Sequence, residues 1–188
     1  MKKIGITGSL ASGKTTASKI LSNGKGPLFS ADEVVRDLYS QNIFKKKISS
    51  IFNIPTHSNF KRELYNKILI NNSNIRKLEK IIHPLVRKKM NEFIKKNKDE
   101  KFAFFEIPLL IESKLMKKFN LIIFIKAKKN TRLKRFKSKG GNPKLFFILN
   151  NKQLSDKKKA KHCDYVVVND QNKKVLKRKL LAIFKNNE

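Results

Sequence analysis

Several residue types are scarce in this chain, and each scarcity excludes a class of protein. Tryptophan is absent, and Cys163 is the single cysteine in 188 residues. One cysteine provides neither a disulfide framework nor metal-ligand spacing, so we expect a protein of the reducing cytoplasm, with the thiol at the edge of the core. The longest apolar runs, 102–105 and 121–125, are far too short to cross a bilayer. We therefore expect no membrane association.

Acidic residues are also scarce. The chain has 14 Asp and Glu against 45 Lys and Arg, which gives a formal net charge of +31. Such an excess is typical of nucleic-acid-binding proteins. However, the lysine clusters at 45–47, 88–89, 157–159 and 177–179 fall on different expected helices. Solvated lysine faces explain this spread, so we expect no specific nucleic-acid partner. The positive electrostatic field of these lysines would nevertheless favour a highly anionic substrate.

The strongest motif lies near the start, where Gly-x4-Gly-Lys-Thr runs from Gly8 to Thr15 between a strand-like and a helix-like segment. This spacing is typical of a phosphate-binding loop. We expect Gly8 and Gly13 to adopt positive φ, Lys14 to contact the β- and γ-phosphates, and the Thr15 hydroxyl to bind Mg²⁺. The residues expected to bind ATP at this loop are Gly8, Ala11, Ser12, Gly13, Lys14, Thr15 and Thr16.

Hydrophobic periodicity predicts an α/β fold with five strands and flanking helices in a single domain, 1–188. Expected strands cover 3–7, 28–30, 102–105, 121–125 and 165–168. Expected helices cover 14–23, 34–40, 109–119, 130–139, 144–152 and 173–185. The long helical block 41–98 exceeds what a crossover needs, which predicts a substrate-covering subdomain. Within it, proline should end one helix at His83 and begin another.

Two acidic residues follow expected strands. Asp32 either caps the next helix or faces the nucleotide crevice, because ligands of open α/β sheets bind beyond the carboxyl ends of strands. Glu106 ends an apolar strand, and a carboxylate there can reach Mg²⁺ directly or through water.

A basic segment follows the fourth expected strand, with Arg132 and Arg135 at i, i+3. Gly140 and Gly141 interrupt it, so the segment 129–152 is interpreted as a helical lid over phosphates. A solvated basic helix is the alternative, but the guanidinium fork favours a phosphate contact for Arg135.

Together these residues resemble the dephospho-coenzyme A kinase family over essentially the whole chain. The most specific parts are His-Pro-x-x-Arg at 83–87 and Pro-Leu-Leu-x-Glu at 108–112. The phosphate loop, Ala31-Asp32 with Arg36, the lid at 133–135 and the closing residues also match. Those closing residues are Gln153, Lys159, Asp164 and Asn169.

The resemblance implies a P-loop kinase with a five-stranded parallel sheet, a helical substrate domain and a lid. It implies transfer of the ATP γ-phosphoryl group to the ribose 3′-hydroxyl of dephospho-coenzyme A, with Mg²⁺. Asp32 matches the general base. Substrate contacts are implied for Arg36, Lys61, His83 and Arg87. From its position alone, His83 is more readily a turn or cap residue than a substrate contact.

The chain departs from the family pattern at several positions. Ser30 replaces the first aspartate of a pair, and Glu106 replaces an aspartate. Lys61 and Lys139 replace arginines, so two bidentate contacts become point charges. Ala11 replaces a loop glycine, which requires either negative φ or mild strain. These changes affect expected affinity more than reaction class.

Three functions are compatible with these features. The first is the kinase that the family resemblance implies, acting as a monomer on a small molecule. Another nucleotide or small-molecule kinase with the same loop is the second. A basic nucleic-acid-binding module is the third, and it predicts binding that weakens steeply with salt.

Overall fold

The computed structural model describes residues 1–56, 59–71 and 73–186. The chain forms two compact units, each described separately. The sheet unit comprises Met1–Ser30 and Ile94–Glu188, and the helical unit comprises Ala31–Phe93.

The sheet unit is built on five parallel strands, which confirms the predicted fold class. They are β1 (Lys2–Gly8), β2 (Leu28–Ser30), β3 (Phe102–Glu106), β4 (Leu121–Lys126) and β5 (Tyr165–Val168). Their order in the sheet is β2-β3-β1-β4-β5. The strands of such a sheet are rich in Ile, Val and Phe because helices and loops bury both faces.

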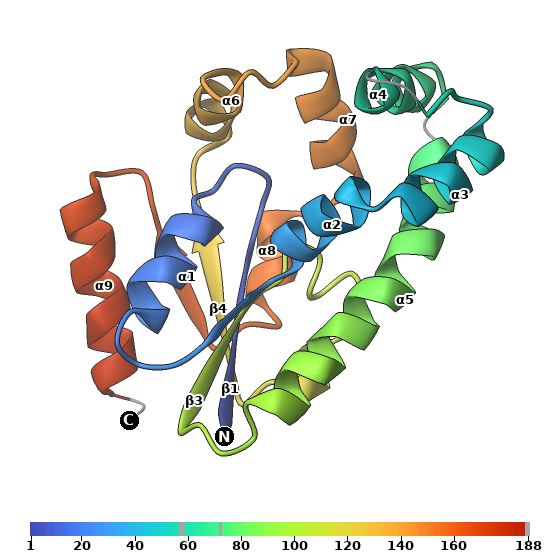
Figure 1. Cartoon of the computed structure of the whole chain (residues 1–188). Helices are drawn as coiled ribbons and strands as arrows, with labels where there is room; N and C mark the ends of the chain where they lie inside the picture. The colour runs from blue at the N-terminus through green and yellow to red at the C-terminus, as the bar shows by residue number, and fades with distance from the viewer. Residues whose placement is uncertain (57–58, 72, 187–188) are drawn as a thin grey trace. The chain divides into compact units, whose positions relative to one another are not determined.

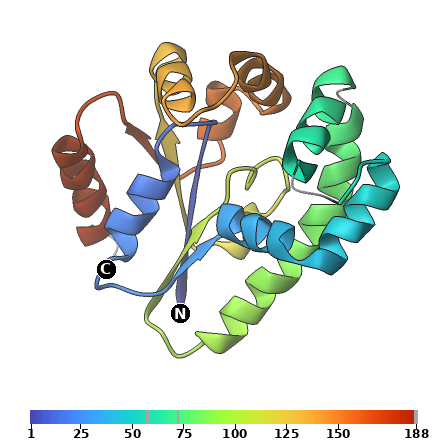
Figure 2. The same ribbon diagram turned by 45° about the horizontal axis from the view of Figure 1, so that its top comes forward.

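Two helices cover one face of this sheet. They are α1 (Lys14–Ser22) and α9 (Lys173–Lys185), which lie side by side in both views (Figures 1 and 2). Alternate side chains of the strands, such as Ile4, Ile6 and Phe104, pack against Leu21 and Leu180 in one buried cluster. This cluster fixes the position of α1 behind β1, and therefore the loop between them.

The opposite face is covered by the segment after β3, where we expected a helix over 109–119. That prediction is wrong: the segment forms consecutive turns and one short 3₁₀ helix, η1 (Met116–Lys118). Lys114 has φ of 55°, a left-handed conformation that ends helical geometry. Instead, Leu110 and Phe119 pack closely over Gly5 of β1. The apolar residues of this segment therefore pack onto the sheet without forming a helix.

The rest of the sheet unit consists of short helices and the half-buried thiol of Cys163. The helices are α6 (Lys129–Lys137), α7 (Pro143–Lys152) and α8 (Asp156–Ala160). The side chains of Asn142 and Ser155 cap α7 and α8. Cys163 donates to the Lys159 carbonyl oxygen at 3.2 Å, and burial raises its pKa to about 12. The thiol therefore lies at the edge of the core, as the sequence predicted.

The helical unit contains α2 (Ala31–Ser40), α3 (Asn42–Phe52), α4 (Phe60–Ile70) and most of α5 (Ser73–Lys96). Its core is separate from that of the sheet unit. Side chains from all four helices, including Leu38, Ile48, Leu64 and Ile82, form one buried cluster. Tyr39 packs edge-on against Phe44, with ring centroids 5.3 Å apart.

Two helix boundaries in this unit differ from expectation. Helix α5 continues through Pro84, although we expected a break at His83. Leu78, Ile81, Leu85 and Val86 flank this proline and pack onto the core of the unit. That packing offsets the hydrogen bond that proline removes.

Helix α2 also begins earlier than expected, at Ala31 instead of Val34. Asp32 is therefore an exposed residue in the first helical turn. A carboxylate there stabilises a helix through the macrodipole.

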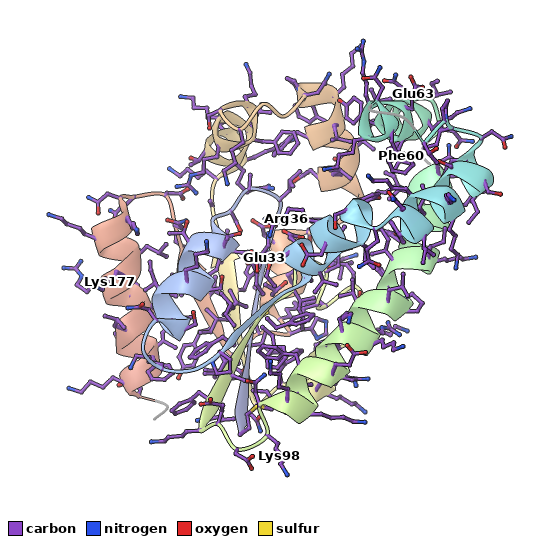
Figure 3. All side chains as sticks on the ribbon, viewed as in Figure 1. Glu33, Arg36, Phe60, Glu63, Lys98 and Lys177 are labelled. Atoms are coloured by element: carbon purple, nitrogen blue, oxygen red, sulfur yellow. The ribbon has the colours of Figure 1, made fainter. Side chains whose placement is uncertain are left out.

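The charges are dispersed over the chain. Nitrogen-tipped side chains such as Lys98 and Lys177 project from separate elements of the sheet unit (Figure 3). Among the helices of residues 1–56, 59–71 and 73–186, we find none that combines the length and apolar character of a membrane span.

Candidate nucleotide-binding site

The register of the sheet brings the ends of β2 and β3 level with Ile6 of β1, two residues before β1 itself ends. Glu106, the last residue of β3, pairs with Ile6 of β1 and Ser30 of β2. The loop 9–13 then leaves β1 at this same carboxyl edge and ends at the start of α1. Ligands of open parallel sheets bind at such an edge, next to a helix N-terminus.

The two loop glycines are required for different reasons. Gly13 has φ of 97° and begins α1, so its left-handed backbone agrees with the prediction. Gly8 does not have positive φ, and that part of the prediction is wrong. Instead, a Cβ on Gly8 would collide with the Ile125 carbonyl oxygen and lie 2.6 Å from the Ser12 hydroxyl. Close approach of the chain is what requires glycine there.

Lys14 lies at the first position of α1 with only 7% of its surface exposed. Its Nζ donates to the Ser9 carbonyl oxygen at 3.2 Å. The Ser12 N–H donates to the same oxygen at 3.1 Å, which closes the turn of the loop. The ammonium group is thereby held along the inside of the loop, in an environment where its charge is poorly screened.

Thr15 and Glu106 meet at the sheet edge. The Thr15 hydroxyl donates to Glu106 Oε1 at 2.6 Å. Ser18 and Ser30 donate to Glu106 Oε2 at 3.4 and 3.3 Å. Glu106 is 1% exposed, so these hydroxyls supply the polar partners that a buried carboxylate needs. Hydroxyl and carboxylate oxygens are also the hard ligands that Mg²⁺ prefers, and the pair fits that ion.

Ala11 adopts the strained conformation that the sequence left as one of two options. Its φ is 59°, in the left-handed region where glycine has no steric penalty. Thr16, the last residue expected to bind ATP at this loop, is exposed in the first turn of α1.

Replacing Ala11 with glycine is expected to stabilise the protein by about 1 kcal/mol, because relief of left-handed strain exceeds the entropy gained by the unfolded chain. Urea unfolding followed by circular dichroism measures this change. Ala182→Gly is the matched control, since Ala182 is exposed inside α9 and glycine there should destabilise by about 1 kcal/mol. Equal signs for both variants would contradict the strain at Ala11.

The two arginines of α6 hold the loop in different ways. Arg132 is 5% exposed, and it donates to the Leu10 carbonyl oxygen at 3.3 Å and to Asn150 Oδ1 at 2.8 Å. Burial lowers the pKa of its guanidinium, and the nearby Asp156 carboxylate opposes that shift. Arg135 donates to the carbonyl oxygens of Ser12 and Asn169 at 3.3 and 3.0 Å. The alternative of a solvated basic helix does not fit these contacts.

Residues far along the chain also contact the loop, and sequence reasoning assigned them no role. Asn169 follows β5 and donates through Nδ2 to the Ser12 carbonyl oxygen at 2.8 Å. Gln153 and Asp156 accept from the Leu10 N–H and the Ser9 hydroxyl. Gln153 and Asn169 belong to the closing pattern that the family resemblance includes. That pattern was the available signal.

The remaining predicted residues lie in the helical unit. Arg36 of α2 and Lys61 of α4 line a pocket of about 560 Å³ within this unit. Arg36 and Phe60, another lining residue, are labelled in Figure 3. His83 is partly buried on α5, and Arg87 is exposed one turn further along. Neither of these two lines the pocket.

The pocket itself combines cations with aromatic rings. Lys45 adds a third positive group, and Tyr39, Ser40, Thr56 and Phe60 complete the lining. The rings of Tyr39 and Phe60 have centroids 6.3 Å apart, and burial raises the pKa of Tyr39 to about 12. This lining suits an anionic ligand that also carries a flat or apolar group.

Comparison with known proteins agrees with this architecture. The family model described as dephospho-CoA kinase matches residues 2–174. A relative from Bartonella quintana (strain Toulouse), named dephospho-CoA kinase, is 34% identical over 191 residues, which cover 99% of this chain and 98% of the relative.

Two solved structures share the fold. One, from Thermus thermophilus, has a TM-score of 0.78 at 22% identity and covers 98% of this chain and 97% of that chain. The other, a dephospho-CoA kinase from Campylobacter jejuni, has a TM-score of 0.65 at 22% identity and covers 98% and 96%.

The parallel sheet and the loop between β1 and α1 define a P-loop kinase. Such kinases hold the phosphates of a nucleotide at that loop. The chain belongs to the dephospho-CoA kinase family, and its enzyme class is that of phosphotransferases with an alcohol acceptor in coenzyme A biosynthesis.

Proposed function

We propose that this chain transfers the γ-phosphoryl group of ATP to the ribose 3′-hydroxyl of dephospho-coenzyme A, which gives coenzyme A and ADP. The observation that carries the proposal is the alignment of Lys14, Thr15 and Glu106 at the edge where the phosphate loop leaves the sheet. Family membership supplies the acceptor class. The rest of the assignment follows from what each side chain can do.

The phosphates of ATP bind at the loop. Backbone N–H groups of the loop and of the first turn of α1 point toward an anion at a helix N-terminus. These groups belong to Ala11, Gly13, Lys14, Thr15 and Thr16, while the Ser12 N–H closes the turn of the loop and Gly8 permits the close approach of the chain. Lys14 neutralises charge that develops on the transferred group, and Arg135 assists from α6.

The Thr15 hydroxyl and the Glu106 carboxylate hold Mg²⁺ in this proposal, because they are adjacent hard oxygen ligands. Mg²⁺ held by these two groups would neutralise negative charge on the phosphates. Ser30, which replaces a family aspartate, donates to Glu106 instead of adding a second carboxylate. Glu106 is therefore the one carboxylate at a place where the family pattern has two, one of them at position 30.

Asp32 acts as the general base. It follows Ser30 by two residues, so the two Cα atoms lie within about 7 Å of one another through the chain itself. Its carboxylate accepts the proton of the ribose 3′-hydroxyl while that oxygen attacks the γ-phosphorus. The bond between the γ-phosphorus and the β–γ bridging oxygen breaks, and ADP leaves.

The pocket of the helical unit receives the acceptor. Arg36, Lys45 and Lys61 supply positive charge to its lining, and Tyr39 and Phe60 supply aromatic surface. A nucleotide-like acceptor with phosphates and a base or pantetheine arm matches that combination. His83 and Arg87 add further contacts from α5, and 129–152 acts as a lid.

Replacing Lys61 with alanine is expected to raise KM for dephospho-coenzyme A about tenfold, since a charge-assisted contact is lost. Lys61→Arg is expected to lower this KM, because it restores a bidentate fork. Lys77→Ala is the control, since Lys77 is exposed on α5 and lies outside the pocket. Steady-state kinetics at saturating ATP measure all three. Matching KM values for Lys61→Ala and Lys77→Ala would remove Lys61 from the acceptor site.

A panel of acceptors tests the function directly. The protein is incubated with ATP, Mg²⁺ and either dephospho-coenzyme A, adenosine or nucleoside monophosphates. We expect ADP formation with dephospho-coenzyme A. A phosphorus–proton correlation spectrum should place the new phosphate on the ribose 3′ oxygen, through coupling to the 3′ proton. Phosphorylation of nucleoside monophosphates alone would overturn the assignment.

We further infer a monomeric enzyme of the cytoplasm that acts on small molecules and has no specific nucleic-acid partner. The dispersed lysines support the absence of a specific nucleic-acid partner, and the single, half-buried thiol of Cys163 fits a reducing compartment. Salt-sensitive binding to nucleic acid of any sequence would reflect net charge alone.

A further inference from the structure

Three side chains from beyond β4 fix the tip of the phosphate loop. The Leu10 N–H donates to Gln153 Oε1 at 3.1 Å, and the Leu10 carbonyl oxygen accepts from Arg132 at 3.3 Å. The Ser9 hydroxyl donates to Asp156. Figure 2 shows α6 and α7, which carry or precede these residues, beside this loop. Both polar backbone groups of the tip residue therefore have side-chain partners.

The segment that carries Gln153 is itself anchored from another part of the sheet unit. Glu112, in the turns after β3, accepts from the Leu154 N–H through Oε1 at 3.1 Å. The same oxygen lies 2.8 Å from Nζ of Lys159, which is fully buried in α8. A buried ion pair costs desolvation, and what it can supply in return is a fixed geometry. Here it fixes the backbone next to Gln153.

We infer that Gln153 is a positioning residue for the nucleotide. Its side-chain oxygen accepts a hydrogen bond from the Leu10 N–H, which turns this donor away from the phosphates. The same bond sets the path of the loop before Ala11, so that the N–H groups after Leu10 converge on the anion. An anion site whose donors are fixed in advance binds without the cost of ordering the loop. The inference rests on the proposed function only in taking ATP as the ligand of the loop.

The test removes the acceptor while preserving the shape of the side chain. Gln153→Met has similar length but no strong acceptor for the Leu10 N–H. We expect ADP to bind about fivefold more weakly by isothermal titration calorimetry, in line with the net loss of one hydrogen bond. Hydrogen exchange of the peptide that contains Leu10 should accelerate by about the same factor.

Two further variants separate positioning from a general structural effect. Gln153→Glu retains an oxygen acceptor, and we expect it to restore hydrogen-exchange protection at Leu10. Asn151→Ala deletes an amide from an exposed position of α7 and should match wild type in both assays. In turnover assays, Gln153→Met should raise KM for ATP and leave KM for the acceptor unchanged.

The outcomes are distinct. Nucleotide affinity and Leu10 exchange in Gln153→Met equal to those of Asn151→Ala would overturn the inference. If Gln153→Met does not fold, Ser9→Ala removes the contact between the loop and Asp156, three residues after Gln153, and is measured in the same way. ADP binding requires no acceptor, so a wild-type protein that fails to phosphorylate dephospho-coenzyme A would contradict the proposed function and leave this test intact.

Discussion

Replacing Lys14 with methionine is expected to reduce kcat/KM for ATP by about 10³-fold. The ammonium group is almost fully buried along the phosphate loop and donates to the Ser9 carbonyl oxygen at 3.2 Å. In such a poorly screened position its charge acts strongly on phosphates, and most strongly when negative charge develops on the transferred group. Initial rates over a range of ATP concentrations measure the loss.

Methionine retains the length and apolar stem of lysine, so the fold should tolerate this change. We expect the unfolding temperature to stay within about 3 °C of wild type, because removal of a buried charge also removes its desolvation cost. Lys19→Met is the matched control, since Lys19 is exposed on the same helix. If the two variants turned over ATP at rates within about threefold of one another, Lys14 would have no special part in catalysis.

Sequence reasoning recovered the sheet because its evidence is local. Strands β3 and β4 are short runs of buried apolar residues, and every expected strand end lies within one residue of the observed one. The loop after β1 carries its own spacing. Glu106 and Thr15 were predicted as metal ligands from their separate motifs, and the structure brings them within 2.6 Å. Parallel pairing of β1 and β3 explains this contact, because the loop that leads from β1 to Thr15 and the end of β3 at Glu106 share one edge of the sheet.

The wrong predictions share a physical origin, which is tertiary packing that overrides a local rule. Helix α5 continues through Pro84 because apolar residues on both sides pack onto one core. The segment 109–119 has helical apolar spacing but packs as turns over Gly5. Gly8 is a glycine because of a neighbour on β4, which no feature of its own loop reveals.

The contacts of Gln153, Asp156 and Asn169 with the loop were beyond sequence reasoning for a different reason. These residues lie more than 140 positions from the loop, and amide or carboxylate side chains have many possible partners. A family pattern can mark such positions without stating what they touch. Only the folded chain determines which backbone groups each of these side chains satisfies.

Replacing Asp32 with asparagine is expected to lower kcat by about 10² or more and to leave ATP affinity nearly unchanged. Asparagine is nearly isosteric, but its amide cannot accept the proton of the ribose hydroxyl. Asp32 is exposed in the first turn of α2, outside the phosphate loop, so nucleotide binding should not depend on it. Single-turnover kinetics measure the chemical step, and calorimetry with ADP measures affinity.

Glu33→Gln is the matched control for this prediction. Glu33, which is labelled in Figure 3, follows Asp32 in the sequence and is exposed in the same helical turn of α2. Its loss removes the same favourable interaction with the helix macrodipole. Any effect on helix stability, about 0.5 kcal/mol for one exposed carboxylate, should therefore appear in both variants. Only the variant at position 32 should slow phosphoryl transfer. Equal single-turnover rates in the two variants would show that the carboxylate of Asp32 takes no proton, and that its position at the start of α2 serves the helix alone.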